Sequence, residues 1–304
     1  MFDSGVLGSA RAPIAVASVG KLAVGGTGKT PVAAWIASML RERGARPSIV
    51  MRGYGSDEPL VHARLNPGVP VFANPDRLAG VLAASAAGCD VAVLDDGFQH
   101  RRVRRDEDVV LVSADRWREP ARLLPAGPWR EPVASLSRAS FVIVTRRAVS
   151  SGTSASLLAM LAPRSRRREG AVVLLSLGAL HNVTTGEERP LSNLRNARVL
   201  AVSGIGDPRS FEAQLREAGA RVAVREFPDH HVYGLSDAAA LSRDAASVEY
   251  VVCTMKDAVK LAPLWPREGP SPWYVSLRCG IEVGGAELSA LLERVLAARP
   301  TPKT

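Results

Sequence analysis

Residues 23–31, AVGGTGKTP, place three glycines ahead of a lysine and a threonine, in the order of a phosphate-binding loop. Glycines let successive backbone N–H groups turn inward around an anion. Lys29 is then placed to reach the β- and γ-phosphates of a nucleotide, and Thr30 to bind Mg²⁺. The strict P-loop pattern has a glycine where this chain has Ala23, so we rely on the order strand, glycine loop, helix. The predicted nucleotide-binding residues are Gly25, Gly26, Thr27, Gly28, Lys29 and Thr30.

A second polar segment, VAVLDDGFQHRR at 91–102, follows an apolar run. An apolar strand ending in acids has the form of a Walker B strand, so we predict that Asp95 and Asp96 bind Mg²⁺. Gln99 and His100 come next, above the carboxyl end of the strand, where open α/β sheets bind ligands. A solvated polar turn would use the same residues, but the glycine loop upstream favours the metal site.

Two further segments carry groups with several possible roles. FPDHHVYG at 227–234 places two histidines beside an acid, which suits a general base, a metal site or an ordinary loop. No third ligand pattern accompanies these histidines, which disfavours zinc. GYGSDEPLV at 53–61 contains two acids that fit the start of a helix, and the sequence alone assigns them nothing more.

The elements that must position these residues alternate between apolar strands and helices. Strands are expected at 13–20, 47–53 and 89–97, and helices at 29–44 and 77–88. Such alternation predicts an α/β fold with a P-loop NTPase-like, mostly parallel sheet flanked by helices, and a second, smaller, Rossmann-like α/β domain. We expect a P-loop domain at 1–165, linker strands at 166–190 and the smaller domain at 191–304.

The composition favours anionic partners. The chain has 304 residues, with 39 Lys and Arg against 30 Asp and Glu, a net charge of +9. No basic helix with interleaved aromatics occurs, so we expect no nucleic-acid partner. The first twenty residues lack the regions of a signal peptide, and no apolar window reaches membrane-spanning length. We therefore expect a cytoplasmic protein.

Eight segments together resemble the tetraacyldisaccharide 4′-kinase family, the lipid A 4′-kinases. They occur in family order from about residue 19 to residue 261. DDGFQH following GGTGKTP is the most specific combination. The matching segments are VGKLAVGGTGKTP, RGYG, DEPL, DDGFQHRR, LLPAGPWREP, SGIGDPRSF, FPDHHVY and TMKDAVKL.

The resemblance implies an enzyme that uses ATP and Mg²⁺ to phosphorylate the 4′-hydroxyl of a tetraacylated glucosamine disaccharide 1-phosphate. It also implies peripheral contact with the cytoplasmic face of the inner membrane, and the oligomeric state stays open. By the matching motifs, Lys29 is the catalytic residue that contacts the nucleotide, Asp57 is the base, and His230 is its partner from the second domain. The residues expected at the metal are Thr30, Glu58, Asp95 and Asp96. The residues expected to contact the substrate or the transferring phosphate are Gln99, His100 and Arg130.

Three features depart from the family pattern. The apolar N-terminal segment is short, only Ser56 separates RGYG from DEP, and Met255 replaces a glutamate. Two other functions stay open on this sequence: a P-loop ATPase switch that acts on a protein partner, and a kinase of another sugar or lipid acceptor. Dependence of the rate on the acyl chains would separate the last from a lipid A kinase.

Overall fold

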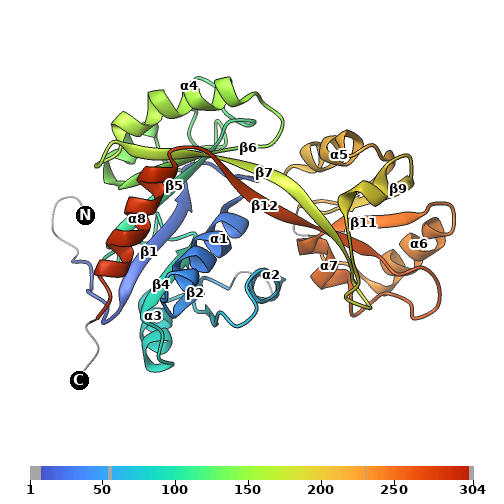
Figure 1. The fold of residues 1–304 in the computed structure, drawn as a ribbon, viewed down its shortest axis with the longest axis horizontal. Coiled ribbons are helices and arrows are strands. Elements are labelled where there is room, and N and C mark those ends of the chain that lie inside the picture. Colours follow the sequence, from blue (N-terminus) through green and yellow to red (C-terminus); the bar gives the residue numbers. More distant parts are fainter. Residues whose placement is uncertain (1–7, 54–56, 230, 301–304) are drawn as a thin grey trace. The chain divides into compact units, whose positions relative to one another are not determined.

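The computed structural model describes residues 8–53, 57–229 and 231–300. The chain divides into two compact units. Unit 1 contains the residues up to 174 and those from 279 onward, and unit 2 contains residues 175–278. The chain passes from unit 1 to unit 2 within β7 (Glu169–Asn182) and returns within β12 (Trp273–Val283), the two long strands of Figure 1.

Unit 1 is built on a parallel sheet with the order β7-β6-β5-β1-β4-β2-β3. Its further strands are β1 (Ala15–Lys21), β2 (Pro47–Met51), β3 (Val71–Ala73), β4 (Val91–Asp95), β5 (Glu107–Ser113) and β6 (Phe141–Arg146). Every residue of β4 and β5 is buried. Strands that are apolar on both faces need cover on both faces, which confirms the predicted parallel sheet flanked by helices.

The helices of unit 1 follow the strands in the expected alternation. They are α1 (Lys29–Glu42), α2 (Asp57–Leu65), α3 (Arg77–Ala86), α4 (Ser151–Leu161) and α8 (Gly285–Ala297), with 3₁₀ turns η1 (Val133–Arg138) and η2 (Ala162–Arg164). In α1, Val32, Ile36 and Leu40 recur at helical spacing and are fully buried, as their pattern predicts. Gly28 caps the start of this helix, and its left-handed φ of 79° suits glycine.

The C-terminal helix α8 lies in unit 1, whereas the sequence placed residues 191–304 in the second domain. Its buried leucine face, which includes Leu288, Leu291 and Leu292, contacts α1, β1 and β5. The Arg294 guanidinium donates to Glu107 Oε1 and Glu169 Oε2, at 2.7 Å each. The amphipathic pattern of this helix predicts a buried face but does not say which sheet that face covers.

Unit 2 has a parallel sheet with the order β10-β9-β11-β12, and it is the second α/β unit that the sequence predicts. Its elements besides β7 and β12 are β8 (Glu188–Arg189), η3 (Leu191–Leu194), β9 (Arg198–Ser203), α5 (Pro208–Glu217), β10 (Arg221–Glu226), α6 (Leu235–Ala245), β11 (Tyr250–Thr254) and α7 (Met255–Leu261). Among its core side chains are Val199, Leu215 and Val252, all fully buried.

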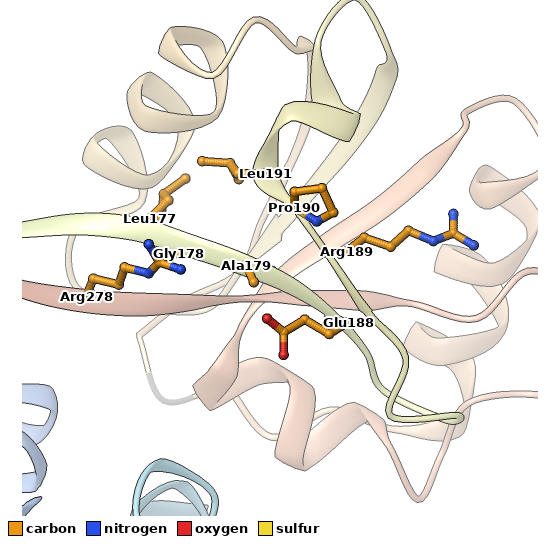
Figure 2. A pocket seen from close by; sticks show the side chains of 8 residues that line it. All are labelled: Leu177, Gly178, Ala179, Glu188, Arg189, Pro190, Leu191 and Arg278. Carbon is orange, nitrogen blue, oxygen red and sulfur yellow. The ribbon is translucent and has the colours of Figure 1, made fainter.

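A pocket of about 490 Å³ lies in unit 2 beside β7 and β8 (Figure 2). A Cβ at Gly178 would lie 2.5 Å from Ser276 Oγ and 3.2 Å from Arg278 Cγ, so glycine lets the arginine cross the strand. No sequence motif points to this pocket. The residues that line it are Leu177, Gly178, Ala179, Glu188, Arg189, Pro190, Leu191 and Arg278.

Among the residues that the structure describes, no helix has both the length and the apolar character needed to cross a bilayer.

Candidate nucleotide and metal site

The glycine loop joins β1 to α1 in unit 1. Gly25 and Gly28 have φ of 100° and 79°, conformations that other residues rarely adopt. A Cβ at Gly25 would lie 2.9 Å from Arg116 Cζ, so this glycine also makes room for a guanidinium. The order strand, glycine loop, helix is therefore present as predicted, and the loop ends at the positive end of the α1 dipole.

Side chains from elsewhere in unit 1 hold the carbonyl groups of this loop. Lys21 Nζ donates to Gly25 O at 3.0 Å, Arg147 Nη1 to Gly26 O at 3.1 Å, and Thr145 Oγ1 to Thr27 O at 2.9 Å. The C=O and the following N–H of one peptide point in opposite directions. The N–H groups of Gly26 and Gly28 are thereby directed away from these anchors, as an anion-binding loop requires.

Lys29 lies between Asp95, the last residue of β4, and Asp96, which follows it. Its Nζ is 3.1 Å from Asp95 Oδ1 and 3.6 Å from Asp96 Oδ2. Parallel pairing of β1 with β4 brings the glycine loop and the acids together, because it aligns Val19 with Asp95 at the carboxyl ends of both strands. The loop lysine and the predicted Walker B acids thus form one cluster.

Burial and charge act in opposite directions in this cluster. Burial disfavours the charged form of Asp95, but Lys29 and a hydrogen bond from His62 hold the pKa of its carboxyl well below the usual range. Burial likewise opposes the charge of Asp96, and Lys29 and Arg130 lower its pKa. Burial opposes the charge of Lys29, yet Asp95, Asp96 and Glu58 raise its pKa. Both acids and the lysine are therefore ionised at neutral pH.

The oxygen atoms of this cluster suit Mg²⁺, which prefers hard oxygen ligands. Asp96 Oδ1 is buried and accepts no hydrogen bond from the described residues. Thr30, next to Lys29 in the first turn of α1, is 4% exposed. One cation, the Lys29 ammonium, already lies between the carboxylates. The residues present fit the metal that the phosphate loop predicts.

Helix α2 places the two acids of the DEP segment in its first turn. Asp57 is buried, with 7% of its surface exposed. Glu58 is close enough for its charge to raise the pKa of Lys29. The segment predicted to be a helix start thus also lies at the nucleotide cluster.

Gln99 and His100 follow the acids in a turn that begins at Asp96, whose φ is 60°. Gln99 Nε2 donates to Lys21 O at 2.9 Å and to Glu131 Oε1 at 3.0 Å, so this amide bridges the end of β1 to Glu131. Its Oε1 is buried and accepts no hydrogen bond from described residues. Burial and the charge of Arg77 lower the pKa of His100.

Arg130 reaches the cluster from a tight turn formed by residues 122–129. Its Nη1 donates to Asp96 Oδ2 at 3.1 Å, and its backbone N donates to Leu22 O at 2.7 Å. Val24 N also donates to Pro128 O at 2.8 Å. The turn is therefore attached to the glycine loop, and it brings one arginine to the acids.

Three residues near this cluster were missed from the sequence: Arg77, His62 and Glu131. Arg77 is only 4% exposed, and burial lowers the pKa of its guanidinium. The negative charges of Asp96, Asp95 and Glu58 oppose that shift, so Arg77 lies near these acids. Its Nε has no hydrogen-bond acceptor among the described residues. Nothing in the local pattern NPDRLAG distinguishes a buried arginine from an exposed helix start, so no signal in one sequence would have identified it.

The FPDHH segment lies in unit 2, and His230 is outside the residues that the structure describes. Beside it, His231 Nε2 is 3.1 Å from Asp237 Oδ2, and its ring packs against Phe227 and Tyr233. The Tyr233 hydroxyl donates to buried Asp257 at 2.9 Å. The segments FPDHHVY and TMKD therefore meet in unit 2.

Comparison with known proteins agrees with this geometry. The model of the tetraacyldisaccharide-1-P 4′-kinase family (LpxK) matches residues 1–297. Curated tetraacyldisaccharide 4′-kinases are similar over nearly the whole chain. That of Halorhodospira halophila is 40% identical, covering 98% of this chain and 88% of its own. That of Anaeromyxobacter sp. strain K is 38% identical, covering 100% and 87%.

A solved structure has the same architecture. LpxK from Aquifex aeolicus, crystallised in complex with ATP, superposes with a TM-score of 0.71 at 28% identity, covering 97% of this chain and 92% of its own. With a family model matching almost every residue and relatives near 40% identity, the chain belongs to the tetraacyldisaccharide 4′-kinase family.

Proposed function

We propose that this chain transfers the γ-phosphoryl group of ATP to the 4′-hydroxyl of a tetraacylated glucosamine disaccharide 1-phosphate. The observation that carries the proposal is the Lys29 ammonium lying between Asp95 and Asp96 at the end of a glycine loop. That cluster supplies what a phosphoryl transferase needs, a lysine for phosphates and carboxylates for a metal. The identity of the acceptor is inferred from the chain's membership of the kinase family.

The nucleotide is held by the glycine loop, with Lys29 contacting its phosphates and Thr30, Asp95 and Asp96 holding Mg²⁺. When bound, Mg²⁺ neutralises charge on the phosphates. Glu58 adds negative charge near the bound Mg²⁺, because its carboxylate is close enough to raise the pKa of Lys29. Gln99 and His100 remain the predicted contacts to substrate, and the buried Gln99 Oε1 offers one acceptor.

Two arginines supply positive charge for the transferring phosphoryl group. Arg130 is bonded to Asp96 in this structure, and buried Arg77 lies in the field of the same acids. Phosphoryl transfer depends on positioning and charge neutralisation more than on covalent chemistry by the protein. We therefore assign Arg77 with Arg130 to the phosphate-binding side of the site.

We further infer that Asp57 takes the proton of the acceptor hydroxyl and that His230 assists it. This assignment comes from the matching motifs DEPL and FPDHHVY. Burial of Asp57 at the start of α2, beside Glu58, supports a role at the nucleotide cluster.

Peripheral contact with an anionic membrane also belongs to this proposal. The substrate is a lipid, and the chain carries a net charge of +9. The turn at 122–129 presents Leu123 and Leu124, which are 43% and 54% exposed. Arg122 in this turn and Arg118, four residues before it, are both exposed. Apolar side chains flanked by cations are suited to the interface of an anionic bilayer.

Replacing both leucines, Leu123→Ser with Leu124→Ser, is expected to lower the partition coefficient onto phosphatidylglycerol-containing vesicles about 10- to 100-fold. The reason is that burying an exposed leucine contributes about 1.5–3 kcal/mol, and these two are already half buried. Vesicle co-sedimentation measures the effect. Leu82→Ser, on α3 and 48% exposed, is the matched control and should bind as the wild type does. Equal binding of the double variant would refute the contact.

The proposed reaction is tested by incubating the protein with γ-labelled ATP, Mg²⁺ and the tetraacyl disaccharide 1-phosphate in detergent micelles. Label in the lipid supports the proposal. A rate that survives deacylation of the acceptor would point to another, more soluble substrate. ATP hydrolysis without label in any lipid would instead favour a nucleotide-dependent switch.

A further inference from the structure

His62 is a fully buried histidine that contacts the metal-side acid Asp95. The side chain lies in the middle of α2 and has no exposed surface. Its Nε2 is 2.8 Å from Asp95 Oδ2. The other oxygen of Asp95 lies 3.1 Å from the Lys29 ammonium, as expected of an ionised carboxylate, which can only accept hydrogen bonds, so Nε2 is the donor.

We propose that His62 is a positioning residue for Mg²⁺ binding, acting through Asp95 and through the placement of α2. The inference rests on the proposed function, because it assumes that Asp95 serves the metal. It concerns a residue outside every motif that the sequence analysis used.

The two oxygens of Asp95 are divided between two partners. Oδ2 accepts from His62, and Oδ1 faces the Lys29 ammonium at 3.1 Å. A carboxylate with one oxygen bonded to a buried ring has little freedom to rotate. The other oxygen is therefore presented to a cation in one orientation, which is the work that hydrogen-bond partners of metal ligands do in metal sites.

The same bond attaches α2 to β4. Glu58 and His62 are four residues apart and lie on one face of the helix. At the other end of α2, Asn66 Nδ2 donates to Ala34 O on α1. His62 thus fixes the face of α2 that carries Glu58, whose charge acts on Lys29.

Packing alone gives no reason for an imidazole at this position. His62 Nδ1 is buried and has no hydrogen-bond partner among the described residues. Burying a polar atom without a partner costs free energy, and an apolar side chain of similar size would avoid that cost. The bond to Asp95 is the contact that accounts for the histidine.

Two replacements of His62 separate the hydrogen bond from the packing. His62→Leu keeps a buried side chain of similar size and removes the donor. His62→Gln carries an N–H the same number of bonds from Cβ as Nε2 of histidine, so it can restore the donor. Val61→Ala is the matched control, because Val61 is the buried neighbour on α2, at 3% exposure, and makes no contact with Asp95 through a polar atom.

The readout is the Mg²⁺ concentration at which ATP binding is half maximal, measured by titration calorimetry without lipid acceptor. We expect His62→Leu to raise this concentration about 10- to 100-fold, the usual effect of losing a partner of a metal ligand. His62→Gln should recover most of that loss. Val61→Ala should lower the unfolding temperature and leave the Mg²⁺ requirement unchanged.

Two results would overturn the role of His62. An unchanged Mg²⁺ requirement in His62→Leu would show that the bond does not position Asp95. An equal rise in Val61→Ala would show a general effect of loosening α2. Because no acceptor is present, failure of the wild type to phosphorylate the lipid would count against the proposed reaction and leave this measurement intact.

Discussion

Lys29→Ala is expected to lower the rate of phosphoryl transfer to the lipid acceptor about 10²- to 10³-fold, the range for loss of a preorganised donor to a developing charge. The structure gives the reason, since Lys29 Nζ lies 3.1 Å from Asp95 and 3.6 Å from Asp96, at the point where loop and acids meet. Its removal also leaves two buried carboxylates without their cation. Initial rates with labelled ATP measure the effect.

Lys29→Arg tests whether charge alone is sufficient. A guanidinium keeps the positive charge but replaces a compact ammonium by a wide planar group, in a position that is only 12% exposed. We expect this variant to remain close to Lys29→Ala in rate. Circular dichroism of both variants controls for folding, and near wild-type rates in Lys29→Ala would rule out the assignment of this loop.

Asp57→Asn is expected to lower kcat about 10²- to 10⁴-fold while leaving ATP affinity near that of the wild type. The expected size is that of a lost general base. Asparagine has almost the volume of aspartate, so it fits a position that is 7% exposed and can still begin α2. Steady-state kinetics, together with calorimetric ATP binding, separates the chemical step from nucleotide binding.

The pairing of Asp57 with His230 has its own test. If the two act as one unit, the double variant Asp57→Asn with His230→Ala will be no slower than the slower single variant. Rate losses that multiply would show that the residues act independently. Retention of the wild-type kcat in Asp57→Asn would exclude this carboxylate as the base.

The nucleotide cluster was largely predictable because its signals are local. Gly25, Gly28 and Lys29 follow one another in the order typical of a phosphate loop, and Asp95 follows an apolar run. Parallel pairing then brings both segments to the same edge of the sheet. Where a function is built from short contiguous segments, sequence spacing carries most of the geometry.

What escaped prediction depends on distant contacts. His62 lies 33 residues from Asp95 in the chain, and its helical neighbours show nothing of the acid it meets. Buried Arg77 looks like any helix start. Glu131 accepts from Gln99 and Arg138, a pairing set by the turn of residues 122–129 rather than by spacing. Such partners follow from the fold, which a single sequence specifies only as a class.

The location of α8 has a consequence for the order in which the protein is made. The face of β1 and β5 that α8 covers is synthesised early, whereas the helix follows the whole of unit 2. During translation, that apolar face stays without its covering helix while residues 175–278 emerge from the ribosome. Unit 2 is therefore able to finish folding before unit 1, although residues up to 174 of unit 1 leave the ribosome earlier. The nucleotide-binding unit is complete only after the last helix has been released.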